Sequence, residues 1–428
     1  MKTHLAVLLA AGMIVSSSLQ AKNLEETRAD AEQGIAEAQY ELGLRYINGK
    51  GVEESDTEAV KWFRKAVAQG HADAQRRLGM CCLLGVGVPQ DAVEAVKWLH
   101  LAAAQNNAGA MKQLGVCYSL GSGVPKDIAE GLKWLRQAAE RGDADAQVEL
   151  GVAYFDGEGV MQDAAEAVKW FRKAAEQGDL NAQKLLGNTC IQGVRLPQDL
   201  PEGVKWYRKA AEQGDAEAQM KLGLAYSLGA GVTLDLKQAQ SWLRKAAEQE
   251  YAPAQMEMGV SYMLGSGVER DEAEAVKWFR KAAEQGDADA QTKLAVAYLH
   301  GTGVDRNIAE AVDWFRKAAE QHFPAAQIGL GECHLKGEGV PQDAAEAVKL
   351  FRAAAERGDA AGQFALSLQY EQGQGVELQL VEALKWCRLA SAQGHEIAEI
   401  HQITLEATMK REQIIEAVRL AREWKPAN

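Results

Sequence analysis

The chain lacks an excess of positive charge and, after its first residues, lacks long apolar runs. Its 47 Lys and Arg residues are outnumbered by 60 Asp and Glu residues, which gives a formal net charge of -13. A surface of this sign repels phosphate backbones and anionic lipid headgroups, so the composition argues against nucleic acid as a partner. No later apolar run reaches the roughly 20 residues of a membrane-spanning helix. We therefore expect no integral membrane segment in the mature protein.

Common catalytic motifs are missing as well. No Ser is followed by Lys three residues later, as in serine acyl-enzymes, and neither glycine-rich phosphate-binding pattern occurs. His395 and His401 are six residues apart, whereas zinc hydrolases space two His by four so that both imidazoles share one helix face. The sequence therefore indicates no catalytic residue, no metal site and no cofactor.

The first 21 residues have the pattern of a signal peptide. A short basic start, Met1–His4, precedes an apolar stretch, Leu5–Val15, and a small and polar end, Ser16–Ala21. The apolar stretch is too short to span a bilayer, which argues against an uncleaved membrane helix. We expect cleavage after Ala21 and no lipid anchor, because no Cys follows. The mature protein is then exported, either periplasmic or secreted.

What the sequence does contain is a repeat of 36 residues. Nine of its ten Trp residues recur at this step, and Leu350 occupies the one vacant position: Trp62, Trp98, Trp134, Trp170, Trp206, Trp242, Trp278, Trp314 and Trp386. Gln residues keep the same step, with Met111 as the exception: Gln39, Gln75, Gln147, Gln183, Gln219, Gln255, Gln291, Gln327 and Gln363. Such fixed-period similarity is typical of a solenoid, in which each unit needs its neighbours to bury its apolar face.

Each unit predicts two helices. In the unit 146–178, Ala146, Leu150 and Tyr154 share one face of a first helix, which ends at Gly157. In the second helix, Trp170 recurs at helical spacing among Ala and Phe. This spacing favours a place in the core over a carbohydrate-stacking track.

The second helix begins at a capping signature. Asp163 can accept a hydrogen bond from a free backbone N–H, and Glu166 can bond back to complete a capping box. The same pair recurs in other units as Asp91 with Glu94, Asp127 with Glu130, Asp199 with Glu202, Asp271 with Glu274 and Asp343 with Glu346. Helix starts are therefore encoded in nearly every unit.

The unit reads A-x-A-Q-x-x-L-G-x-x-Y-x-x-G-x-G-V followed by E-A-V-K-W-F-R-K-A-A-E-Q-G, which closely resembles the Sel-one-like repeat, a relative of the tetratricopeptide repeat. The resemblance implies an all-α fold, a right-handed α/α superhelical solenoid of about ten repeats over 36–394. A capping half-repeat at 22–35 would precede them, and capping helices at 395–428 would follow. Since members of this family resemble adaptors, scaffolds and secreted interaction proteins, we expect a protein or peptide partner.

Some units depart from the pattern. Arg195 and Leu196 replace the second Gly and the Val of the turn, Ala295 and Ser367 replace the small Gly of the first helix, and His334 replaces Tyr. We expect these changes to alter local geometry and to leave the fold intact.

The six cysteines fall on apolar positions of the repeat. Cys82 and Cys190 replace Tyr, Cys387 replaces Phe, and the other three occupy a small-residue position: Cys81, Cys117 and Cys333. Equivalent positions on neighbouring units lie about a helix diameter apart, beyond the roughly 7 Å that a disulfide allows between Cα atoms. We therefore expect buried, unpaired thiols.

A cysteine-rich branch of the family has a Cys pair in each unit and is linked with β-lactam binding and hydrolysis. That periodic pairing is missing here. A hydrolase of β-lactams or cell-wall peptides is thus the alternative to a scaffold.

Two rows of residues on the first helices are candidates for partner binding. The variable row directly follows the Gln: Tyr40, Arg76, Lys112, Val148, Lys184, Met220, Met256, Thr292, Ile328 and Phe364. The apolar row lies four residues later: Leu44, Met80, Val116, Val152, Asn188, Leu224, Val260, Val296, Glu332 and Leu368. By resemblance to tetratricopeptide solenoids, both rows face the concave groove.

Within the variable row we predict that seven residues contact the partner: Tyr40, Arg76, Lys112, Lys184, Met220, Met256 and Phe364. The basic residues in the first half would suit an extended peptide or amphipathic helix with acidic residues. The alternative is that the variable row is solvated and the apolar row packs between units.

Overall fold

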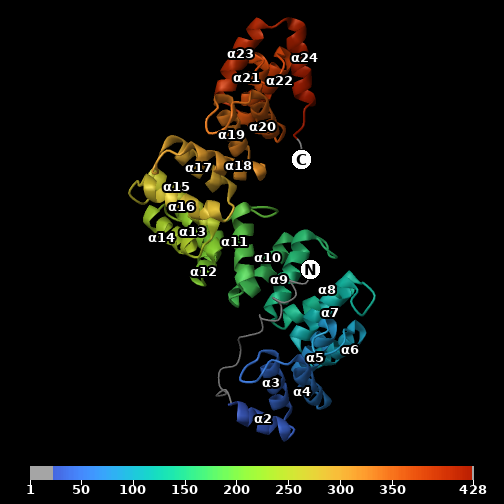
Figure 1. The fold of residues 1–428 in the computed structure, drawn as a ribbon. Coiled ribbons are helices and arrows are strands. Elements are labelled where there is room, and N and C mark those ends of the chain that lie inside the picture. The colour runs from blue at the N-terminus through green and yellow to red at the C-terminus, as the bar shows by residue number, and fades with distance from the viewer. Residues whose placement is uncertain (1–22, 427–428) are drawn as a thin grey trace. The chain divides into compact units, whose positions relative to one another are not determined.

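The computed structural model describes residues 23–426, which form twenty-three α-helices and no strand. The predicted signal peptide, 1–21, lies outside these described residues. Neighbouring helices pack in antiparallel pairs that follow one another along the chain (Figure 1). The expected all-α architecture of helix pairs in series is therefore confirmed. The chain divides into two compact units, 1–198 and 199–428.

The first described helix of unit 1 is the short α2 (Leu24–Glu32), which has a capping box at its N-terminus. The repeats then alternate first and second helices: α3 (Ala36–Ile47), α4 (Asp56–Ala68), α5 (Ala72–Leu84), α6 (Ala92–Ala104), α7 (Ala108–Leu120), α8 (Ile128–Glu140), α9 (Ala144–Asp156), α10 (Ala164–Glu176) and α11 (Leu180–Gln192).

Unit 2 continues the alternation, so that odd numbers remain first helices: α12 (Leu200–Glu212), α13 (Ala216–Leu228), α14 (Leu236–Glu248), α15 (Ala252–Leu264), α16 (Glu272–Glu284), α17 (Ala288–His300), α18 (Ile308–Glu320), α19 (Pro324–Lys336), α20 (Ala344–Glu356), α21 (Ala360–Gln372) and α22 (Leu380–Ala392). The chain closes with α23 (Glu396–Thr408) and α24 (Arg411–Glu423), both packed on α22.

The predicted capping boxes form only in half. Asp163 accepts a hydrogen bond from the backbone N–H of Glu166, as expected. The return bond is not made, because the backbone N–H of Asp163 already donates to the carbonyl of Tyr154 at 2.9 Å. The Glu166 carboxylate instead accepts a bond from Lys169 at 2.9 Å. The same backbone bond ties the start of nine second helices to the first helix of their own repeat, as from Asp91 to Cys82 and from Asp271 to Tyr262.

A close approach between the two helices of a repeat requires the small residue of the first helix. The ring of Phe171 on α10 lies over Gly151 on α9, and a Cβ at Gly151 would come within 2.6 Å of the ring. Phe171 is buried there. Where Leu replaces the Phe, a Cβ on the facing glycine would lie 3.1 Å from Leu99 at Gly79 and 2.6 Å from Leu135 at Gly115.

The departures from Gly at this position are compensated nearby. Ser367 lies in the last repeat, where Cys387 replaces the bulky Phe of the second helix. Ala295 keeps a Phe partner, Phe315, but this ring lies against Gly329 on α19, where a Cβ would come within 2.5 Å. The loss of space on one helix is therefore matched by a gain on another, and the fold is kept.

The turn at Arg195 keeps the backbone conformation of the other turns, although Arg replaces their second Gly. Arg195 adopts a φ of 66°, the left-handed conformation that glycine provides in the other turns. Its guanidinium lies 4.8 Å above the centre of the Phe155 ring and donates to the Phe155 carbonyl. These contacts offset the strain of a positive φ in a residue with a side chain.

Buried Gln side chains form a ladder of hydrogen bonds along the repeats. In the first repeat the Gln39 Nε2 donates to the carbonyl of Ala31 at 3.1 Å, and its Oε1 accepts from Gln69 at 2.8 Å. The same Gln pairs form at Gln75 with Gln105, Gln147 with Gln177, Gln219 with Gln249, Gln255 with Gln285, Gln291 with Gln321 and Gln363 with Gln393. Buried amides need such partners. The Gln pair ties the two helices of one repeat together, and the bond to the Ala carbonyl ties that repeat to the helix before it.

The ladder is broken where the second Gln is Arg. Arg141 stands opposite Met111, which has no amide to satisfy, and it bonds Asn106 instead. Arg357 stands opposite Gln327, whose buried Oε1 has no hydrogen-bond partner.

The Trp positions belong to the core. Five of the nine indoles are buried and the other four are half-buried. Trp170 reaches back into the apolar cluster of the preceding repeats, and the ammonium of Lys173 lies 3.9 Å above its ring. An indole covered on one face by protein and on the other by Lys leaves no track for sugar stacking.

We predict that Gly151→Ala destabilises the protein by about 1–3 kcal/mol, because the new methyl group overlaps the Phe171 ring. The midpoint of urea unfolding, followed by circular dichroism, measures the change. In a Phe171→Ala background, which removes the ring, the same substitution should lower the free energy of unfolding clearly less. An equal cost in both backgrounds would show that the ring contact is not the cause.

We predict that Arg357→Gln stabilises the protein by about 1 kcal/mol. The new amide can donate a hydrogen bond to the buried Oε1 of Gln327, which has no partner among the described residues. Arg357 is exposed, so the change itself removes little packing. The matched control, Arg141→Gln, faces Met111 and should give no gain. A rise in the unfolding midpoint for both variants, or for neither, would contradict the role of the Gln pair.

Candidate interaction site

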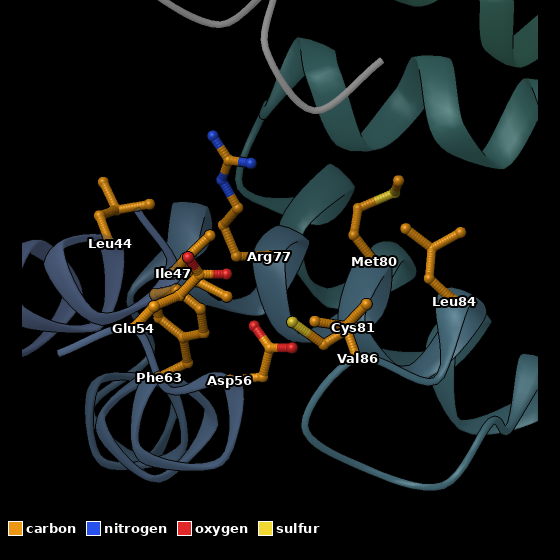
Figure 2. Close-up of a pocket in the computed structure, with 10 residues that line it drawn as sticks. All are labelled: Leu44, Ile47, Glu54, Asp56, Phe63, Arg77, Met80, Cys81, Leu84 and Val86. Atoms are coloured by element: carbon orange, nitrogen blue, oxygen red, sulfur yellow. The ribbon is translucent and has the colours of Figure 1, made fainter. Parts of the chain in front are cut away.

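Unit 1 contains an apolar pocket between the first helices α3 and α5. Its volume is about 260 Å³, and Phe63 of α4 contributes a buried aromatic wall. Figure 2 shows the lining residues: Leu44, Ile47, Glu54, Asp56, Phe63, Arg77, Met80, Cys81, Leu84 and Val86.

Unit 2 contains a larger pocket between the first helices α15 and α17. Its volume is about 520 Å³, within the range typical of ligand pockets. Its lining residues are Val260, Met263, Leu264, Phe279, Asp289, Thr292, Lys293, Val296, Ala297, Thr302 and Ala325.

The two pockets occupy the same positions of the repeat, six repeats apart in the sequence. Corresponding residues are Leu44 and Val260, Ile47 and Met263, Phe63 and Phe279, Arg77 and Lys293, Met80 and Val296, Cys81 and Ala297, and Val86 and Thr302. Each pocket has the apolar row on its walls. The repeat itself therefore builds this kind of pocket between consecutive first helices.

The same close approach that packs each repeat also shapes the pocket. Phe63 lies over Gly43 and Phe279 lies over Gly259, so each ring is held between its two helices. Phe63 and Phe279 thus pack against these glycines and also line the pockets. A partner side chain would meet a rigid, pre-formed surface.

Both pockets carry charged groups at their edge. In unit 1, Arg77 accompanies Glu54 and Asp56, and Figure 2 shows its guanidinium directed away from the Asp56 carboxylate. The buried Nε of Arg77 has no hydrogen-bond partner among the described residues. In unit 2, Lys293 forms an ion pair with Asp289 at 3.4 Å.

The variable row packs between repeats. Tyr40 stacks on His71 with ring centres 4.9 Å apart, and Phe364 lies 4.9 Å from His395. Met220 and Met256 are half-buried against the apolar clusters of unit 2. These four predicted partner residues therefore contribute to the contact between neighbouring repeats.

The basic members of the variable row are largely engaged within the fold. Arg76 pairs with Asp73 at 3.6 Å, and Lys112 is buried and pairs with Asp145. Lys184 is half-buried on α11. Partner contact by these residues stays a prediction, because the pocket walls hold the apolar row and, from the variable row, only Thr292. The aromatic walls, Phe63 and Phe279, were missed because their sequence pattern is that of core residues.

The cysteine and histidine side chains have structural places. All six cysteines are unpaired, and five are buried, as predicted. Burial raises the pKa of Cys81 to about 12 and of Cys117 and Cys387 to about 11, which keeps these thiols protonated at neutral pH. His395 caps α23, and His401 bonds Glu371 at 2.7 Å.

Residues 23–426 contain neither a metal-binding cluster nor a membrane-spanning helix. No group of three or more His, Cys, Asp or Glu side chains there is arranged to hold a metal ion. None of the helices in the same range combines the length and apolar character needed to cross a membrane.

Two solved structures are similar to this chain. A crystal structure of c5321, a protective antigen present in uropathogenic Escherichia coli strains and displaying an SLR fold, is 35% identical, covers 94% of each chain and has a TM-score of 0.61. A Sel1 repeat protein from Oxalobacter formigenes is 30% identical over 84% of this chain and 97% of its own, with a TM-score of 0.43.

A curated relative matches a short part of the chain. The secretory immunoglobulin A-binding protein EsiB of Escherichia coli O6:H1 is 41% identical over 69 residues, which are 15% of this chain and 14% of EsiB.

The model of the Sel1 repeat matches ten consecutive stretches of the chain: 36–71, 72–107, 108–143, 144–179, 180–215, 216–251, 252–287, 288–323, 324–359 and 360–395. These matches agree with the helix pairs of the structure. Together with the similarity to c5321 over nearly the whole of both chains, they show that the chain belongs to the Sel1 repeat family.

Proposed function

We propose that this protein is an exported scaffold that binds a peptide or protein through the pockets between its first helices. Proteins built from Sel1 repeats are in general protein-interaction scaffolds. The observation that carries the proposal is the recurrence of one apolar pocket at equivalent positions in unit 1 and unit 2. A surface that the repeat generates more than once suits a partner with several apolar side chains.

The pocket in unit 2 is the better placed of the two for an incoming side chain. It is the larger, and Leu264 at its rim is 72% exposed. Val296 on its wall is 42% exposed, although both residues are large and apolar. Exposed apolar side chains beside a concave surface are typical of protein-binding sites.

Two further observations support the wider proposal. The first 21 residues have the pattern of a signal peptide, which favours export. The relative EsiB is named for binding secretory immunoglobulin A, a protein ligand. The match to EsiB spans a small part of both chains, so we take from it only the class of ligand.

We predict that a photo-reactive amino acid at position 264, at the rim of the unit 2 pocket, cross-links a protein partner in cells that express this chain. The matched control is position 228, which is the equivalent Leu of an earlier repeat, is 75% exposed and lines neither pocket. Adducts from position 264 should fall at least tenfold when Val296 is changed to Asp, because a carboxylate is costly to bury in an apolar pocket.

The control for that change is Val152→Asp. Val152 belongs to the same apolar row, is 36% exposed and lines neither pocket. Adducts that form equally at positions 264 and 228, or that survive Val296→Asp, would show that the pocket does not bind the partner.

A further inference from the structure

The helix α23 in unit 2 exposes an apolar face. Ile397, Ile400 and Ile403 are 63%, 69% and 69% exposed, although their side chains are large and apolar. Their spacing of three residues places them along one side of the helix, while Ala398 and Leu405 are buried on the other side. Exposed apolar side chains that gather on one surface are typical of a binding site.

This face is open because α24 does not pack on α23 as a second helix packs on a first helix. In the preceding repeat α22 packs on α21, and the small residue of α21, Ser367, is fully buried. The same position of α23 is Ile403. The helix α24 packs on α22 instead, where the rings of Trp424 and Trp386 have centres 5.9 Å apart. One side of α23 is therefore left uncovered by residues 23–426.

The first described helix, α2, has a polar outer face instead. Its exposed residues are those expected of a cap that separates a solenoid from water: Glu25, Glu26, Arg28, Ala29 and Glu32. They offer no large apolar side chain to the isoleucines of α23. A head-to-tail contact between copies, with α23 of one on α2 of another, is therefore disfavoured.

The isoleucine face of α23 is complementary to itself. Ile400 is flanked by Ile397 and Ile403 at equal spacing, so the apolar pattern is the same in both directions along the helix. A two-fold contact needs a surface that can pack on an identical copy of itself. Two antiparallel copies of this row meet that condition.

The charges at the two ends of α23 favour the same antiparallel arrangement. Glu396 and Glu399 in the first turn are exposed, and so are Lys410 and Arg411, which follow the helix. Because a helix rises 1.5 Å per residue, about 21 Å separates Glu396 from Lys410 within one copy, too far for an ion pair. In an antiparallel pair of α23 helices, the acidic turn of each copy lies near the basic residues of the other.

We propose that α23 is the contact surface between two copies of this chain, which pack their isoleucine faces antiparallel about a two-fold axis. The dimer removes Ile397, Ile400 and Ile403 from water and brings opposite charges of the two copies together. It also joins two sets of pockets in one molecule, so that a partner with several apolar segments can bind both copies. This inference goes beyond the proposed function, since it holds whether or not the pockets bind a partner.

Sedimentation velocity of the purified full chain, from nanomolar to near-millimolar concentration, measures the self-association. A contact of one helix with one helix is small, so we expect a reversible dimer with a dissociation constant in the micromolar range. A chain that stays monomeric throughout this range overturns the inference. Binding of such a monomer to phosphatidylcholine vesicles through Ile400 would assign the face to a membrane and would overturn it as well.

A substitution at the centre of the face tests the contact. Ile400→Glu should weaken the dimer at least tenfold, because it places two carboxylates against each other on the two-fold axis. The matched control is Ile415→Glu on α24, whose side chain is 60% exposed, and it should change the dissociation constant less than twofold. Equal weakening by both variants, or by neither, means that α23 is not the contact surface. Melting curves establish that each variant is folded.

A charge swap tests the antiparallel orientation. Glu396→Lys with Glu399→Lys should weaken the dimer about tenfold, because like charges of the two copies then meet. This double variant also reduces the net negative charge of the chain, so general repulsion does not explain such weakening. Adding Lys410→Glu and Arg411→Glu should restore the original affinity to within threefold. Since the two ends of one α23 helix are too far apart to interact, recovery reports a contact between copies, and failure to recover overturns the antiparallel dimer.

Discussion

The structure depends on one close approach, between an aromatic or Leu side chain of nearly every second helix and the small residue of the first helix. At Gly151 a single added carbon would come within 2.6 Å of the Phe171 ring. Interiors are packed too densely to absorb such an overlap without cost. The repeats that depart from Gly accordingly change a second residue, as Ser367 does with Cys387 and Ala295 with Gly329.

The same approach links the fold to the candidate site. Because Phe63 and Phe279 are held against their glycines, each ring forms a fixed wall of a pocket between consecutive first helices. The buried Gln side chains act in parallel, since each pairs with a Gln of its own repeat and donates to an Ala carbonyl of the preceding helix, as Gln39 and Gln255 do. Packing and hydrogen bonding therefore determine the spacing of the first helices, and this spacing determines the pocket.

The two rows on the first helices have different tasks. Several side chains of the variable row contact a particular neighbour within the fold, as Tyr40 does His71 and Lys112 does Asp145. The apolar row is less varied, yet Val296 remains partly exposed on a pocket wall. Variation within a repeat protein can thus reflect local packing between units, while an unremarkable apolar position lines the surface available to a ligand.

The sequence by itself determined the number and length of the repeats, the helix starts, the buried Trp positions and the unpaired cysteines. These features follow from periodicity, capping residues and apolar spacing, which act within one unit. Only the tertiary structure decided how the Gln side chains pair, why the capping boxes are half-formed and which side chains line the pockets. Each of these depends on atoms from residues far apart in the chain, such as Gln39 with Gln69 or Phe279 with Val296. A sequence pattern does not specify such distances until the helices have packed.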